Sequence, residues 1–322
     1  MNDEQFSKQF QANYDRVINY MGHGSNQHLA MSLASKYTIN KKQFSGVMLR
    51  KVMEIINEEK SFSLQLESVM SYKLASYLME EKDIHTAIKQ INNHDSLLAD
   101  VKFKQSSFRI LGALFLQEGS LEHARRAKSL FDEMNRHQPF LTSKEDIPYV
   151  VVQTSVQEDS IGQRAETIQR YYLELKKHQF IIGNHLQALS QIMTIYSTEY
   201  NALLVQYTVQ LRKELNKQNI KVKRVHYPFI GILALAATDD FIIREICILY
   251  QQLMEQKAFR YAKEYALIVA IQKIVNDLLE VQNLVELTPL TRLGQMSEIA
   301  EFVLEFTSLI PSGVSDIIDF FN

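Results

Sequence analysis

The stretch of sequence that decides the fold is YYLELKKHQ, residues 171–179. Similar text lies on either side of it, as LFDEMNRHQ at residues 130–138 and LRKELNKQN at residues 211–219. Each stretch contains two apolar residues one helical turn apart and ends in basic and amide side chains. Basic residues in a last helical turn complement the negative end of the helix dipole. Each stretch therefore predicts the C-terminal end of an amphipathic helix.

The apolar pair occurs five times along the chain. Its occurrences are Ala87/Ile91, Leu130/Met134, Tyr171/Leu175, Leu211/Leu215 and Tyr250/Met254. Successive second members lie 43, 41, 40 and 39 positions apart, and a second apolar run follows each pair. A period of this length is typical of stacked helical hairpins, in which neighbouring units bury a shared apolar face.

Composition agrees with helices joined by short turns. The chain has 322 residues, of which 46% are hydrophobic, with only 10 Gly and 5 Pro. We therefore predict an all-α fold, an α-solenoid-like array of about five antiparallel helical hairpins. Residues 1–82 are expected to form an N-terminal helical bundle or cap, residues 83–284 the hairpin repeats, and residues 285–322 C-terminal capping helices.

Two resemblances follow from these patterns. Leu111-Gly112, Phe115 and Ala124 resemble part of a tetratricopeptide signature, although Lys128 stands where that signature has an aromatic residue. In general terms the chain is similar to tetratricopeptide-like and HEAT-like solenoids. By its length and by the recurring sequence at its expected helix ends, the chain also resembles an uncharacterised bacterial domain-of-unknown-function family of helical proteins. That resemblance implies no activity and no functional residues.

Charge and cysteine content exclude several classes of function. The 35 Lys and Arg and 37 Asp and Glu residues give a net charge of −2, so we expect no nucleic-acid partner and no membrane partner. Cys247 is the single cysteine, which excludes an intrachain disulfide and thiolate zinc sites, and its apolar neighbours predict a buried structural thiol. The N-terminal residues lack a signal-peptide pattern, and a cytoplasmic protein is expected.

No motif of catalysis or cofactor binding occurs. The phosphate-binding and dinucleotide-binding glycine patterns and the nucleophile elbow are absent, and the nine histidines lack metal-ligand spacing. Asp239 and Asp240 resemble part of a diphosphate-binding motif, but Asp239 takes the repeat position of Asp159, where a helix N-cap is the better interpretation. We therefore predict no catalytic residue, no cofactor and no metal site.

One group of residues is a candidate binding surface. If the units stack in register, the helix ends that carry Arg136, Lys176, Lys177, Lys217 and Lys221 line up as a basic edge that could meet an acidic peptide or a phosphate backbone. The alternative is a solvated face whose charges match the helix dipoles. The function expected is non-enzymatic protein or peptide binding through a repeat surface. A small-molecule or peptide sensor, with a pocket between the N-terminal bundle and the repeats, is the alternative, and a helical enzyme is the third possibility.

Overall fold

The computed structural model describes residues 1–22, 26–59, 66–117, 119–155, 160–195, 197–236, 242–260, 262–285 and Val303. These residues form fourteen α-helices and three short 3-10 helices, and none of them lies in a strand. The predicted all-α class is confirmed. The last predicted segment, 285–322, lies outside the described residues except for Val285 and the buried Val303.

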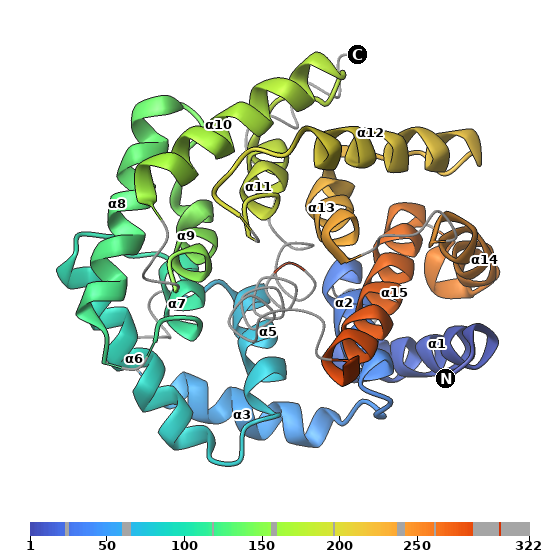
Figure 1. The fold of residues 1–322 in the computed structure, drawn as a ribbon. Coiled ribbons are helices and arrows are strands. Elements are labelled where there is room, and N and C mark those ends of the chain that lie inside the picture. Colours follow the sequence, from blue (N-terminus) through green and yellow to red (C-terminus); the bar gives the residue numbers. More distant parts are fainter. Residues whose placement is uncertain are drawn as a thin grey trace.

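Consecutive helices pack against each other in pairs. The pairs are α1 (Asp3–Met21) with α2 (Gln27–Ile39), α3 (Gly46–Glu58) with α5 (Ser68–Leu78), α6 (Ile84–Asp100) with α7 (Ser107–Leu114), α8 (Leu121–His137) with α9 (Ile147–Gln153), α10 (Ile161–Lys177) with α11 (Asn184–Ile192), α12 (Ala202–Lys217) with α13 (Tyr227–Ala236), and α14 (Ile242–Met254) with α15 (Lys263–Val285). The first helix of each pair lies on the outside and the second faces the centre (Figure 1). The 3-10 helices η1 (Lys144–Asp146), η2 (Arg224–His226) and η3 (Lys257–Phe259) precede α9, α13 and α15.

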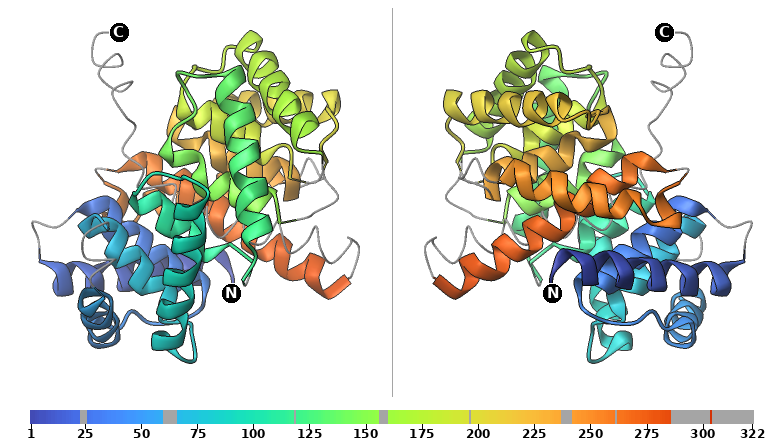
Figure 2. Two further views of the ribbon diagram at one scale, coloured as in Figure 1. Left: turned by 90° about the vertical axis from the view of Figure 1, so that its left-hand side faces the viewer. Right: turned by 90° about the vertical axis from the view of Figure 1, so that its right-hand side faces the viewer.

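The pairs follow one another around a ring, and the first pair packs against the last (Figures 1 and 2). Helix α1 contacts α14, and α2 contacts α15. Phe10 of α1 stacks on Phe259 of η3 with ring centroids 4.9 Å apart. Next to this stack the backbone N–H of Ala258 donates to Oε1 of Gln11 at 3.0 Å. These contacts join segments about 250 residues apart in the chain.

This closure differs from an array with two capped ends. The N-terminal residues were expected to cover only one end of the hairpins, yet α1 and α2 also cover the unit formed by α14 and α15. The reason is that Phe6 and Phe10 are fully buried, and Phe10 meets an equally buried ring from the far end of the chain. The contact between the first and the last pair of helices buries the apolar end faces of both. In an open array, each of these faces would need a separate capping helix.

Local sequence explains where the helices begin. A short polar side chain precedes most of them and accepts a backbone N–H of the first turn, as Ser120 does from His123 at 3.0 Å and Asn201 from Leu203 at 2.9 Å. Such caps satisfy N–H groups that have no partner inside the helix. The same role is filled by Asn2, Asn26, Ser45, Asp83, Ser106 and Ser160.

Three outer helices end in the same way. After α6, α10 and α12, one residue takes a left-handed conformation, and the next residue is apolar and buried. The left-handed residues are Lys102 (φ 71°), Gln179 (φ 63°) and Asn219 (φ 61°). The following backbone N–H returns to the helix, from Phe103 to Leu98 O at 3.1 Å, from Phe180 to Leu175 O at 3.2 Å and from Ile220 to Leu215 O at 3.0 Å. This hydrogen bond and the buried apolar contact fix the exit of the chain from each helix.

Buried polar side chains hold the inner helices to the outer ones. His123 and Arg164 occupy equivalent positions, 41 residues apart, near the starts of α8 and α10. Nε2 of His123 lies 2.7 Å from Val151 O, and Nη1 of Arg164 donates to Thr194 O at 2.5 Å. Each side chain thus reaches a carbonyl at or just beyond the C-terminal end of the inner helix of its own pair, where few helical N–H groups remain to satisfy the carbonyls. These buried groups are explained by packing.

Candidate functional site

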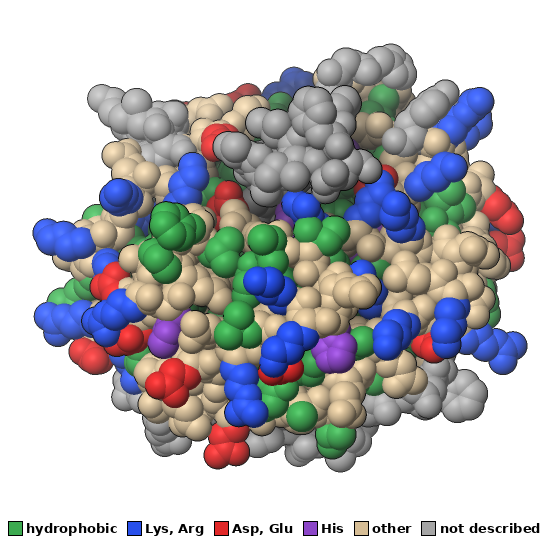
Figure 3. Space-filling model, turned by 90° about the horizontal axis from the view of Figure 1, so that it is seen from above, with side chains coloured by type: hydrophobic (Ala, Val, Ile, Leu, Met, Phe, Trp, Pro, Cys, Tyr) green, Lys and Arg blue, Asp and Glu red, His purple; other side chains and the backbone are tan. Residues whose placement is uncertain are grey.

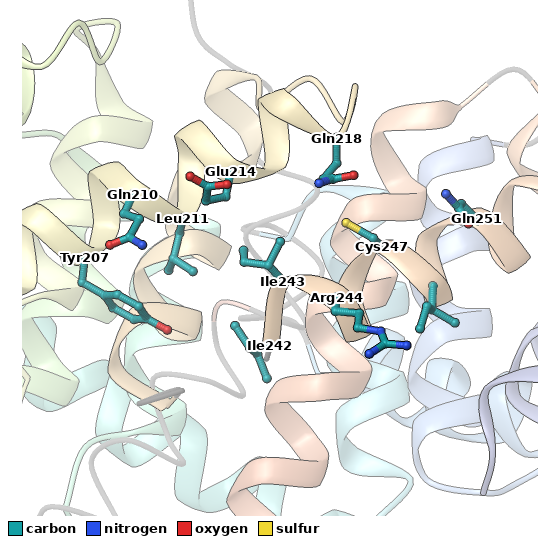
Figure 4. Close-up of a pocket in the computed structure, with 11 residues that line it drawn as sticks. Tyr207, Gln210, Leu211, Glu214, Gln218, Ile242, Ile243, Arg244, Cys247 and Gln251 are labelled. Atoms are coloured by element: carbon teal, nitrogen blue, oxygen red, sulfur yellow. The ribbon is translucent and has the colours of Figure 1, made fainter. Parts of the chain in front are cut away.

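A groove runs along the outer surface between α12 and α14 (Figure 4). Its volume is about 480 Å³, and it is open to solvent along one side. The lining residues are Tyr207, Gln210, Leu211, Glu214 and Gln218 of α12, and Ile242, Ile243, Arg244, Cys247, Ile248 and Gln251 of α14. The volume falls within the range of roughly 300–1,000 Å³ that is typical of ligand sites.

The groove exists because these two outer helices do not pack closely. Helices α8 and α10 contact each other extensively, whereas α12 and α14 touch at few points, as do α6 with α8 and α10 with α12. Each wall is one face of a helix, because the lining positions recur every three or four residues along both α12 and α14. Two helix faces side by side leave a channel of the shape that a third helix fills.

The floor of the groove is apolar and its rim is polar. Leu211 and Ile242 are buried, while Ile248 is 41% exposed. Gln210, Gln218 and Gln251 contribute amides that can both donate and accept hydrogen bonds (Figure 4). The groove can therefore hold an apolar side chain below and satisfy polar groups above.

Two side chains give the groove its chemical character. Arg244 is exposed and makes no hydrogen bond or ion pair with any described residue, and it brings a positive charge to the groove. Cys247 was predicted to be a buried thiol, but the structure places it half-buried in the groove wall. Partial burial raises the pKa of the Cys247 thiol, which keeps it protonated near neutral pH.

The predicted basic edge has a specific local structure. Arg136, Lys177 and Lys217 each pair with a glutamate three residues earlier in the same helix. The distances are 2.5 Å from Arg136 Nη1 to Glu133, 2.7 Å from Lys177 Nζ to Glu174 and 2.7 Å from Lys217 Nζ to Glu214. The hydrogen bond from Lys177 lowers the pKa of the Glu174 carboxyl. The same pair thus recurs at three helix ends and partly neutralises the edge.

Lys176 and Lys221 differ from the other three basic residues. Both are exposed and have no ion pair with a described residue. Lys176 and Lys177 line a second hollow, of about 500 Å³. Its described wall is the outer face of α10, which also carries Arg170 and Leu173. Viewed from the side of α10 and α12, Lys and Arg side chains predominate over Asp and Glu (Figure 3).

Sequence reasoning did not find the groove. Its signal was present in α14, where Ile243 and Ile248 lie off the buried stripe formed by Ile242, Ile246, Leu249 and Leu253. Apolar residues outside the core stripe of an amphipathic helix indicate a contact with something other than the core. The spacing of α12 from α14 has no such local signal.

Other kinds of site were sought among the same residues. In the part of the chain that the structure describes, no three His, Cys, Asp or Glu side chains come together as a set of metal ligands. None of the described helices has the length and apolarity to cross a bilayer. Asp159, Asp239 and Asp240 lie outside the described residues.

Comparisons with known proteins identify one family and one relative. The family described as "Protein of unknown function (DUF4003)" matches residues 13–299. The chain is also similar to a protein of Bacillus subtilis (strain 168) named "Uncharacterized protein YeaA", with 24% identity over 277 residues, covering 81% of each chain. No solved structure matches.

Proposed function

The chain belongs to the DUF4003 family of proteins of unknown function, and from the geometry alone we propose that it is a non-enzymatic protein-binding protein. Its partner supplies an amphipathic helix that lies in the groove between α12 and α14. The observation that carries this proposal is the groove itself, which has two helical walls, an apolar floor and an amide rim.

The shape of the groove selects a helix as the occupant. Side chains at intervals of three and four residues on a partner helix would meet the matching intervals on both walls. Leu211, Ile243 and Ile248 provide apolar contacts at the floor and sides, where buried apolar area gives most of the binding free energy. An extended peptide would leave most of its backbone groups without partners here, since side chains alone line the walls.

Charge favours an acidic residue on the partner helix. Arg244 lies on the α14 wall without a partner among the described residues, whereas Glu214 on the opposite wall is already paired with Lys217 at 2.7 Å. A carboxylate next to Arg244 would form a charge-assisted hydrogen bond. The occupant is therefore an amphipathic helix with an apolar ridge and an acidic residue beside it.

We further infer that the hairpins of residues 83–284 are copies of one repeat, as in solenoids, here with a ring-shaped outline. The recurring glutamate pairs at three helix ends and the three matching left-handed exits support this. In such a scaffold the repeated positions maintain packing, and side chains that differ from unit to unit, such as Arg244 and Ile248 of α14, provide specific surfaces.

The experiment uses Cys247, the single thiol of the chain, as an anchor in the groove. A benzophenone maleimide attached to Cys247 at mildly alkaline pH is irradiated in an extract of the source cells, and cross-linked peptides are sequenced by mass spectrometry. The matched control is a Cys247→Ser, Leu203→Cys protein, which carries the probe at an exposed site outside the groove. We expect one partner peptide, specific to Cys247, with an amphipathic helical pattern and an acidic residue.

Affinity measurements with the synthetic partner peptide complete the test. Arg244→Glu should weaken binding by about tenfold or more, because it replaces a charge-assisted contact by repulsion. Arg16→Glu, on the exposed face of α1, makes the same charge change outside the lining of the groove and should leave binding unchanged. The proposal fails if both probe positions capture the same peptides, if only small molecules are captured, or if the two arginine variants bind alike.

A further inference from the structure

Exposed apolar side chains protrude from one edge of the ring. This edge, here named the loop edge, consists of residues 101–106, 138–143, 178–183 and 218–223, which leave the C-terminal ends of α6, α8, α10 and α12. Phe140 is 99% exposed, and Ile181 and Ile182 are 43% and 54% exposed. Phe140 and Ile181 are 41 positions apart, so adjacent units place them at matching points.

The loop edge is held together by contacts between neighbouring units. Nδ2 of Asn184, at the start of α11, donates to Oε2 of Glu145 in η1 at 2.7 Å, which links the residues that follow the third and second loops. The backbone N–H of Ile181 donates to the Tyr227 hydroxyl of α13 at 3.1 Å, and Arg212 of α12 donates to Gln179 O at 3.0 Å, which tie the third loop to the next pair of helices. These contacts hold the backbone of the third loop, on which the side chains of Ile181 and Ile182 are exposed.

Lysines lie on both sides of this apolar centre. On the side of α6, Lys102 and Lys104 are exposed and make no ion pair with a described residue. On the side of α12, Lys221 is exposed and Lys223 makes only a long contact of 3.7 Å with Glu264. Along the edge the order is thus basic, apolar, apolar, basic, through four consecutive units.

We propose that the loop edge docks on an anionic lipid surface. Phe140, Ile181 and Ile182 would insert between headgroups, while the flanking lysines approach the negative charge of the membrane. The proposal rests on the apolar and basic order of the edge and is independent of the groove between α12 and α14.

Convex shape and charge distinguish a lipid surface from a protein partner. The apolar groups project outward from turns instead of lining a hollow, and a soft interface accepts such projections without a complementary pocket. The near-neutral charge of the whole chain, which predicts no membrane partner, conceals the local excess of lysine at this edge. Surface docking of this kind requires no membrane-spanning helix.

The test is sedimentation of the full-length protein with sucrose-loaded vesicles. One set contains equal parts of phosphatidylglycerol and phosphatidylcholine, and the other contains phosphatidylcholine alone. We expect binding to the anionic vesicles at low ionic strength, little binding to the neutral ones, and a loss of binding as salt is raised. The triple variant Phe140→Ser, Ile181→Ser, Ile182→Ser should bind at least about tenfold more weakly, and Lys102→Gln, Lys221→Gln about tenfold more weakly.

Matched controls make the same chemical changes elsewhere. Val47→Ser and Leu203→Ser remove exposed apolar groups at the starts of α3 and α12, the opposite ends of the outer helices, and Lys51→Gln, Lys82→Gln removes two distant charges. These variants should bind like the wild type. Absence of vesicle binding, equal loss in the controls, or equal binding to neutral vesicles overturns the proposal. Absence of vesicle binding together with a protein retained by the wild type, but not by the triple variant, would assign the edge to a protein partner instead.

Discussion

Closure of the ring makes a strong prediction about Phe10. The side chain is fully buried and stacks on Phe259 at 4.9 Å, where the first pair of helices meets the last. Truncation to alanine removes the aromatic contact and leaves a cavity, which together cost about 3–5 kcal/mol. For 322 residues, an unfolding entropy of roughly 2.1 cal/mol/K per residue gives about 0.7 kcal/mol/K, so Phe10→Ala should lower the melting temperature by about 6 °C.

Phe140→Ala is the matched control, because it makes the same change at a side chain that is 99% exposed. Its effect should stay within about 0.5 kcal/mol, or less than about 1 °C. Both variants are measured by calorimetry and by amide hydrogen exchange with mass spectrometry. In Phe10→Ala, exchange should rise in α14 and α15 as well as in α1, although they are far apart in sequence. The reasoning is refuted if faster exchange remains within residues 1–58, or if both variants melt alike.

The remaining predictions concern buried ionisable groups and glycines. Burial raises the pKa of Asp146 to about 7 and lowers that of His226 to about 4. The raised pKa of the Asp146 carboxyl makes stability fall as pH rises from about 4 to 7. The lowered pKa of the His226 imidazole makes stability increase as pH rises from about 4 to 6.5. The two trends therefore oppose each other in the wild type. Urea unfolding of Asp146→Asn between pH 4.5 and 6.5 should show stability rising with pH by about 2 kcal/mol, and unfolding of His226→Gln should show stability falling over the same range. Flat profiles in both variants would contradict the assignment. Gly231→Ala should destabilise by about 1–3 kcal/mol, because the new Cβ would lie 2.7 Å from Leu189 Cδ1. Gly162→Ala meets no atom within 4 Å and should stabilise by up to about 1 kcal/mol, so the two glycine variants must move the unfolding midpoint in opposite directions.

The helices themselves were accessible from the sequence because their signals are local. Leu130, Met134, Tyr171 and Leu175 are all buried, as their one-turn spacing predicts. Caps such as Ser120 also stand within three residues of the groups they bind. A helix needs only such nearby residues to be specified, so periodicity and capping chemistry identify it.

Ring closure could not be predicted from the sequence, because it depends on contacts between distant residues. Phe10 and Phe259 are apolar residues in two amphipathic segments, and the sequence of neither segment indicates that the two rings pack together. The same holds for the hydrogen bond from Ser35 Oγ to Gln272 Oε1, 2.6 Å long and joining α2 to α15. Contact between the two ends of the chain depends on the small rotation from each unit to the next, which adds up over all the units. The spacing of apolar residues in the sequence does not determine that rotation.

The candidate surfaces consist of positions at which the packing of the hairpins does not require a particular side chain. Positions such as Leu175 and Leu215 must fill the core of every unit, and residues such as Gln179 and Asn219 must turn the chain at each helix end. Ile248, by contrast, faces away from its own core stripe, and Phe140 follows a helix exit without contacting the interior. Exposing a large apolar group at either place gains nothing for folding, since its removal would leave the packing intact. Such residues are therefore where a partner should first be sought.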